Sequence, residues 1–96
     1  MRAIEKRMVA AVNGRNNWYE SNTRVEIVDN NVFVYLWGNL IYRIVNGFHE
    51  FNLCGWNTQT TRSRLNALGV GVGTRNKVAN HNGVDIPNNG WIEVTE

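Results

Sequence analysis

The stretch from residue 23 to residue 53 most constrains the fold, because its apolar residues recur with the period of a β-strand. Four alternating segments occupy residues 23–28, 32–37, 40–45 and 48–53. Two of the links between them, Gly38-Asn39 and Asn46-Gly47, have the length and the residue types of tight hairpin turns. The pattern therefore predicts an antiparallel four-stranded meander.

The expected turns also determine which residues share a face of this meander. Pairing across Gly38-Asn39, with a three-residue link at 29–31, turns Phe33, Tyr35 and Trp37 toward the core. The opposite face then carries the apolar residues Val32, Val34, Leu36, Ile41, Val45 and Phe48. An exposed apolar patch of that size is unusual on a monomer. We therefore expect these residues to form a partner interface, most simply in a two-fold homodimer.

Helical periodicity flanks the meander on both sides. Residues 2–13 predict an amphipathic helix that stops at Asn13-Gly14. A second helix is expected to begin after Asn57 or Thr58, either of which can cap it, and to end at Gly69.

The C-terminal part predicts two further strands. Residues 91–95 alternate and are expected to pair with residues 72–79 in a β-hairpin. We therefore expect residues 1–96 to form a single α+β domain. It would combine the antiparallel four-stranded meander, two helices on one face and the C-terminal β-hairpin.

Composition narrows the class of protein. The 96 residues carry a formal charge of only +2, although eight of the ten cationic residues are arginines. A single cysteine allows no internal disulfide and suits a reducing compartment. The longest apolar stretch, residues 32–41, is shorter than the roughly 18–20 residues of a membrane span and is interrupted at Gly38. We expect a cytoplasmic protein that does not enter a membrane.

The sequence offers little for catalysis. Its histidines, cysteine and carboxylates do not form a recognised metal-ligand spacing, and no motif indicates a cofactor. A nucleophilic pair of Cys54 with His49 is conceivable, but packing explains both residues more simply. The glycines at 69, 71 and 73 follow a helix, whereas a phosphate-binding loop precedes one. We expect a protein that is not an enzyme and holds no metal.

The best polar cluster lies at the start of the second helix. Thr60, Arg62, Ser63 and Arg64 combine hydroxyls with arginines near a helix N-terminus, and Trp56 precedes them. These residues are the candidate nucleic-acid-binding site. A capped surface helix is the simpler interpretation, because Arg62 and Arg64 diverge by ~200° on a helix.

Two segments carry a family resemblance. Residues 34–41, with the sequence VYLWGNLI, and residues 54–68, with the sequence CGWNTQTTRSRLNAL, resemble a family of small proteins encoded by tailed bacteriophages and related mobile elements. The resemblance implies a phage or prophage origin and an accessory role inside the infected cell, so the expected compartment is the host-cell cytoplasm. It implies no activity, so no functional residue follows from it.

These observations predict a small, non-enzymatic phage accessory protein that binds nucleic acid through the arginine-bearing helix. Two alternatives stay open. The first is a protein-binding inhibitor or modulator of a host or defence protein, acting through the apolar sheet face. The second is a structural protein of the virion.

Overall fold

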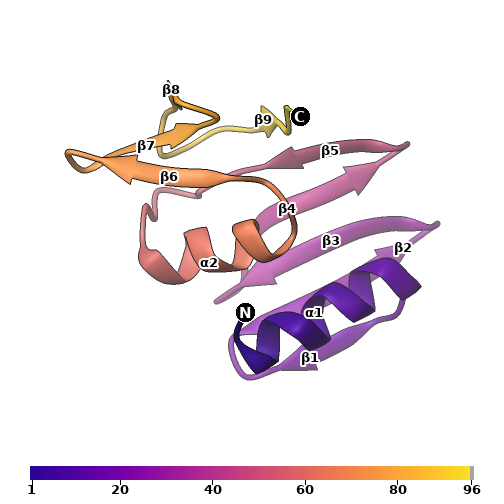
Figure 1. The fold of residues 1–96 in the computed structure, drawn as a ribbon. Helices are drawn as coiled ribbons and strands as arrows, with labels where there is room; N and C mark the ends of the chain where they lie inside the picture. The colour runs from indigo at the N-terminus through magenta and orange to yellow at the C-terminus, as the bar shows by residue number, and fades with distance from the viewer. Residues whose placement is uncertain (96) are drawn as a thin grey trace.

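A computed structural model describes residues 1–95, and within them it shows an α+β fold of two helices and two antiparallel sheets (Figure 1). The elements are α1 (Ala3–Gly14), β1 (Trp18–Glu20), β2 (Thr23–Val28), β3 (Asn31–Leu36), β4 (Asn39–Val45), β5 (Phe48–Phe51), α2 (Gln59–Ala67), β6 (Val72–Arg75), β7 (Val78–His81), β8 (Val84–Asp85) and β9 (Ile92–Glu93). The large sheet has the order β1-β2-β3-β4-β5-β9, and the small sheet has the order β6-β7-β8. The expected meander is present as β2–β5, but β1 and β9 extend it to six strands.

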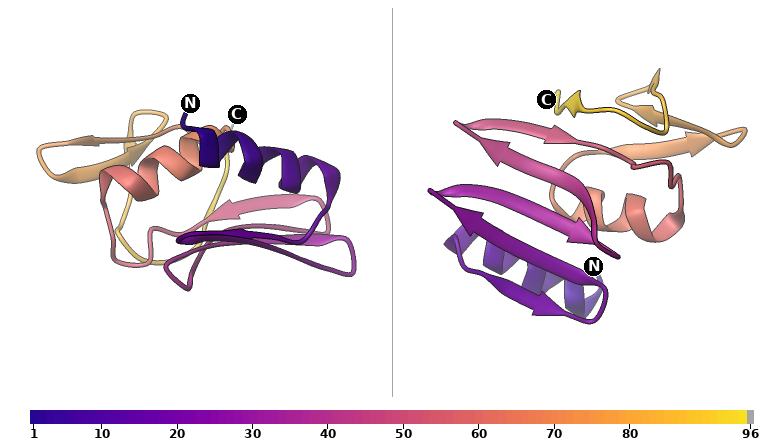
Figure 2. Two further views of the ribbon diagram at one scale, coloured as in Figure 1. Left: turned by 90° about the horizontal axis from the view of Figure 1, so that it is seen from below. Right: turned by 180° about the vertical axis from the view of Figure 1, so that it is seen from behind.

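Both helices lie over the same face of the large sheet, as predicted (Figure 2). The core between them is built from small and medium aliphatic side chains, supplemented by Met8 of α1, Leu65 of α2 and Phe51 of β5. The Thr58 side chain caps α2, since its Oγ1 accepts a hydrogen bond from the Thr61 amide at 3.2 Å. The position of α1 also agrees with the sequence pattern.

The register between β3 and β4 differs from the expected one. The turn residues are Trp37 and Gly38, so Leu36 pairs with Asn39 and Tyr35 pairs with Leu40. A β-bulge then inserts one residue into β4, and beyond it Val34 pairs with Tyr42. The β2–β3 turn is likewise two residues long rather than three. By contrast, the predicted pairs across Asn46-Gly47, including Arg43 with Glu50, are confirmed.

This one-residue shift exchanges the two faces of β3, because side chains alternate along a strand. Val32, Val34, Leu36 and Ile41 lie in the core and not on an outer face, so their assignment to a partner interface is wrong. The two other predicted interface residues, Val45 and Phe48, are half-buried and exposed, respectively. Of the surface on which the expected homodimer was based, only these two residues stay accessible.

The C-terminal segment also pairs differently from the prediction. β9 lies antiparallel to β5, with Phe51 opposite Ile92, and does not pair with residues 72–79. The buried His81 side chain fastens this segment: its Nε2 accepts a hydrogen bond from the Thr95 amide at 2.9 Å. The other ring nitrogen, Nδ1, lies 3.2 Å from the Gly71 carbonyl oxygen. The C-terminal segment thus joins the large sheet while it stays attached to the small one.

Candidate nucleic-acid interface

One face of the large sheet points away from the helices (Figure 2), and its strands place large side chains there. Arg24, Phe33, Tyr35 and Arg43 alternate with the buried residues of β2, β3 and β4. The solvated face of an antiparallel sheet is ordinarily polar. Aromatic rings beside arginines at these positions make this face a candidate binding surface.

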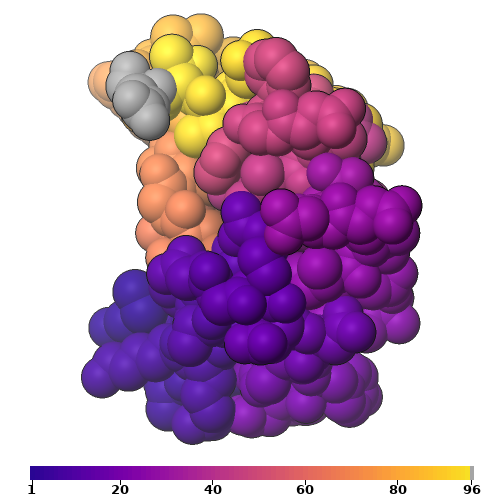
Figure 3. Space-filling view, turned by 90° about the vertical axis from the view of Figure 1, so that its right-hand side faces the viewer, coloured from indigo at the N-terminus to yellow at the C-terminus, as the bar shows by residue number. Residues whose placement is uncertain are grey.

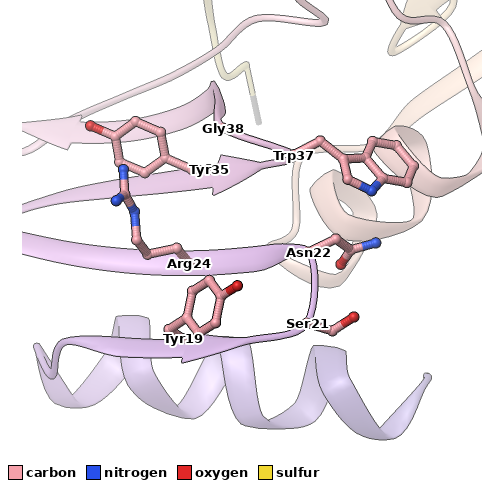
Figure 4. A pocket seen from close by; sticks show the side chains of 7 residues that line it. All are labelled: Tyr19, Ser21, Asn22, Arg24, Tyr35, Trp37 and Gly38. Carbon is pink, nitrogen blue, oxygen red and sulfur yellow. The ribbon is translucent and has the colours of Figure 1, made fainter.

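A hollow of about 300 Å³ opens at one end of this face (Figure 4). Tyr19, Arg24 and Tyr35 form a row across β1, β2 and β3, since Arg24 is the direct partner of both tyrosines. The guanidinium carbon of Arg24 lies 4.2 Å from the centroid of the Tyr35 ring, which is a cation–π geometry. The Tyr19 side chain is 71% exposed, so its ring is available to a ligand.

Trp37, in the β3–β4 turn, lies to one side of this row, near Asn22 of the β1–β2 turn (Figure 4). Its backbone has a φ of 49° and its side chain is 57% exposed. A positive φ is costly for a bulky residue, and Asn, Asp or Gly ordinarily fill such turn positions. Backbone strain of this kind concentrates at functional sites. The exposed indole at a strained position therefore makes this end of the sheet the candidate functional site.

The other hairpin turns show how unusual Trp37 is. Three two-residue turns with positive φ at both positions use only Asn, Asp and Gly, namely Asp29-Asn30, Asn46-Gly47 and Asn82-Gly83. The fourth and fifth, Trp37-Gly38 and Asn76-Lys77, include a large side chain. The sequence thus departs from the favoured turn residues at two of five tips.

Arg64, a predicted nucleic-acid-binding residue, is a structural residue instead. Its side chain is 96% buried, and Nη1 donates to Oε2 of Glu5 in α1 at 2.8 Å. Nε donates to Thr23 Oγ1 at 3.0 Å, and Nη2 donates to Asn22 Oδ1 at 3.3 Å. Arg64 therefore cannot contact a phosphate, and its assignment to the site is wrong. It does support the hollow, because Asn22 lines it.

The partner of Arg64 is held in its charged form. Burial alone would raise the pKa of Glu5, but hydrogen bonds from Ser63 and Arg64 outweigh it and hold that pKa below the ordinary value. The Ser63 hydroxyl donates to Glu5 at 2.6 Å, so Ser63 also belongs to this buried network rather than to a binding surface.

Two of the predicted site residues, Trp56 and Arg62, lie together in a second hollow. It also includes Lys77 and has a volume of about 550 Å³. The Arg62 side chain is positioned by Asn57, since Nη1 donates to its carbonyl oxygen at 3.0 Å and to Oδ1 at 2.6 Å. Thr60, predicted with them, is half-buried near the start of α2 and does not line this hollow.

The far half of the open face is less available. The Arg43 guanidinium carbon lies 3.7 Å from the centroid of the Trp91 ring, and Nε donates to Glu50 at 2.9 Å. Arg43 is thus already paired with the Trp91 ring and the Glu50 carboxylate, so it is less available to a ligand. The candidate site is therefore the Tyr19–Trp37 end.

The structure shows the surroundings of the residues that were considered for metal binding and catalysis. That part contains no cluster of three or more His, Cys, Asp or Glu side chains able to hold a metal ion. The Cys54 thiol donates to the Leu40 carbonyl oxygen at 3.1 Å, and burial raises its pKa, which disfavours the thiolate. His49 pairs with Tyr42 rather than with Cys54, at 2.6 Å between Nδ1 and the hydroxyl, and burial raises the pKa of Tyr42 to about 12.

Comparison with known proteins gives a family. The family model described as Kyanoviridae Gp96 protein matches residues 1–93, nearly the whole chain. The chain belongs to the Kyanoviridae Gp96 protein family. This is a family of phage proteins, which confirms the phage resemblance seen in the sequence. No curated protein and no solved structure is significantly similar to the chain. Across the described residues of this Gp96 protein, every helix is too short or too polar to cross a bilayer.

Sequence reasoning missed Tyr19, Arg24, Tyr35 and Trp37 as site residues of this Gp96 protein. The expected register placed Tyr35 and Trp37 in the core, which removed them from consideration. One signal was present: Trp37 precedes a glycine between two alternating segments. A Trp-Gly turn at that position moves the large side chains of β3 to the open face.

Proposed function

We propose that this Kyanoviridae Gp96 protein binds single-stranded nucleic acid, without catalysis, in the hollow formed by Tyr19, Arg24, Tyr35 and Trp37. The observation that carries the proposal is the combination of exposed rings and a guanidinium on one open sheet end, with an indole at a strained turn position. We place this activity in the cytoplasm of the infected cell, in an accessory role.

The chemistry of the hollow suits a nucleotide. Every base presents a flat π-face that stacks on Tyr or Trp, and a guanidinium binds phosphate through parallel hydrogen bonds. Arg24 is accessible to a phosphate, because its side chain is about half exposed and its ion pair with Glu26 is long, at 4.0 Å. Within the described chain, the residues lining this hollow include no acidic side chain.

The same chemistry favours a single strand over a duplex. In a duplex the base faces are stacked on one another, whereas unpaired bases can lie on protein rings. The row of Tyr19, Arg24 and Tyr35 runs across three strands, and Trp37 lies to one side of it. An open sheet with aromatic rings in a row is a platform that successive bases can use.

Fluorescence anisotropy with labelled single strands of about 12 nucleotides, as DNA and as RNA, tests the proposal. We expect Tyr35→Ala to weaken binding by about 5- to 150-fold, the value of one stacked base. Arg24→Gln should reduce the slope of log affinity against log salt by about 0.7. Arg15→Gln is the matched control, since it removes the same charge from the C-terminal end of α1.

Two results would reject this function. One is the absence of any binding by the wild-type protein to DNA or RNA at low salt. The other is binding that Arg15→Gln weakens as much as Arg24→Gln does, which would indicate a nonspecific response to charge.

A protein contact is the second candidate, and one observation favours it. Phe48 and Val28 are 63% and 44% exposed at the other end of the sheet, where the β2–β3 and β4–β5 turns meet. Figure 3 looks onto this end of the molecule. A host protein could bind there, and a second copy of the chain is the partner to test first. Sedimentation velocity at micromolar concentration should show a dimer that Phe48→Ser dissociates; a wild-type monomer would exclude self-association.

A further inference from the structure

The hollow that contains Trp56 has the same chemistry as the one that contains Tyr35. Its lining includes Trp56, Arg62 and Lys77, with the polar side chains of Asn57 and Thr74 between them. Trp56 is 57% exposed, so its ring can accept a base. Of the described residues that line this hollow, none is acidic. The lining of both hollows therefore suits an anionic ligand with flat rings.

The backbone at the second hollow repeats the feature seen at Trp37. Lys77 occupies the second position of the β6–β7 turn with a φ of 65°. A lysine there is costly in the same way as a tryptophan, because its Cβ crowds the backbone. Both turns that depart from Asn, Asp and Gly border a hollow. The Asn46-Gly47 turn, which keeps the favoured residues, borders another one. The two candidate hollows therefore differ from that one in having a large side chain at a costly turn position.

The β3–β4 turn, whose residues line the first hollow, and the start of α2, whose residues line the second, lie at the same end of the molecule (Figures 1 and 2). The Cys54 thiol donates to the carbonyl oxygen of Leu40, the cross-strand partner of Tyr35. Trp56 follows Cys54 by two residues, and its amide donates to the Leu53 carbonyl oxygen at 2.9 Å. The loop that carries Trp56 is thus fixed against the strand that lies beside Tyr35.

A second set of contacts joins the two sites through α2. The Trp37 amide donates to the Asn22 carbonyl oxygen at 2.8 Å, and Arg64 of α2 donates to the Asn22 side chain. Arg62 lies two residues before Arg64 and faces the second hollow. Hydrogen bonds through Asn22 thus connect the β3–β4 turn, which borders the first hollow, to α2, which borders the second.

We propose, resting on the function proposed above, that one nucleic-acid strand occupies both hollows. It would lie on Tyr19 and Tyr35, pass Trp37 at the end of the sheet, and place a second segment on Trp56 with its phosphates near Arg62 and Lys77. The ligand is then a continuous single strand and not an isolated nucleotide. Joining two segments in one strand raises affinity, because the second contact becomes intramolecular.

Strand length provides the test. Single strands of about 4 and about 12 nucleotides are compared by anisotropy or calorimetry. The wild type should bind the longer strand at least about 100-fold more tightly than the shorter one. Trp56→Ala should weaken the longer strand by about 5- to 150-fold and change the shorter one by less than about 2-fold.

The two lysines of the chain supply a matched pair of charge variants. Lys77→Gln should lower the salt dependence of the longer strand by about 0.7 in slope. Lys6→Gln, which removes the same charge from the exposed side of α1, should leave it unchanged. Both positions are exposed, so neither substitution removes a core contact.

The possible outcomes separate this inference from the function on which it rests. If Tyr35→Ala weakens both strands while Trp56→Ala and Lys77→Gln change neither, the continuous path is overturned and the single-strand function stands. If Trp56→Ala weakens both lengths equally, the path is also overturned, because one short site then includes Trp56. If wild-type protein binds neither strand, the proposed function fails and the path fails with it.

Discussion

The covered and open faces of β2 and β3 are both rich in apolar atoms, yet they differ in the kind of side chain. The covered face has Val25, Val32, Val34 and Leu36, all between 0% and 1% exposed. On the open face, Arg24, Phe33 and Tyr35 alternate with them. Small aliphatic side chains fit under helices, whereas large rings beside arginines remain accessible. Side-chain size and charge thus distinguish a packing face from a binding face when hydrophobicity alone does not.

Placing a charge on each face gives the largest contrast. Val34→Glu should unfold the protein, with a loss of more than about 5 kcal/mol, because the carboxylate would be buried without a partner. Tyr35→Glu, one residue away on the open face, should change stability by no more than about 1 kcal/mol. Its carboxylate would face Arg24 across the strand pair. Urea denaturation followed by circular dichroism measures both variants, and a folded Val34→Glu protein would contradict the register.

The ion pairs of α1 extend the comparison to charged groups. Glu5 pairs with Arg64 in the interior, and Arg7 pairs with Glu20 at the surface. Glu5→Gln should cost about 3–5 kcal/mol, because it leaves the Arg64 charge buried without its partner. Glu20→Gln, the matched control, should leave the urea midpoint nearly unchanged. Equal losses for the two variants would show that the Glu5 network is not buried as described.

The same pair predicts a dependence on pH. The pKa of Glu5 is lowered in the folded state from its ordinary value of 4.5. The stability that its charge contributes is therefore complete above that ordinary value, and it is lost as the pH falls through the lower, folded-state pKa. The difference in unfolding free energy between wild type and Glu5→Gln should shrink over that acidic range. A difference that stays constant from neutral to acidic pH would contradict the assignment.

The parts of the fold governed by local signals were predictable. Asn46-Gly47 matches the favoured turn residues, so the β4–β5 register followed from it, including Arg43 opposite Glu50. The helix periodicity of residues 3–14 and the capping hydroxyl of Thr58 also depend only on near neighbours. These elements needed no knowledge of distant parts of the chain.

The predictions were wrong where a turn departs from the favoured residue types, and where a partner distant in the sequence determines the position of a side chain. Trp37 occupies a turn position that the rules reserve for other residues, and the resulting shift reversed the faces of β3. Arg64 looked like a surface arginine because its partner, Glu5, lies 59 residues away in the sequence. The shifted register hid the residues of the sheet hollow, and the distant Glu5 partner led to the wrong assignment of Arg64 to the binding site.

Replacing Trp37 gives the smallest expected change in stability, and it distinguishes a role in packing from a role in binding. Trp37→Asn should raise the unfolding free energy by about 1 kcal/mol, because Asn adopts a positive φ at lower cost. The same substitution removes a stacking surface from the hollow. A tryptophan retained for packing would give the opposite change in stability.

Measuring stability and single-strand binding together for Trp37→Asn tests the central claim most directly. We expect a protein that is more resistant to urea than the wild type and binds a strand of about 12 nucleotides about 5- to 150-fold more weakly. A variant that is less stable, or one that binds as tightly as the wild type, would contradict the claim that Trp37 is held in its strained turn to stack on a base.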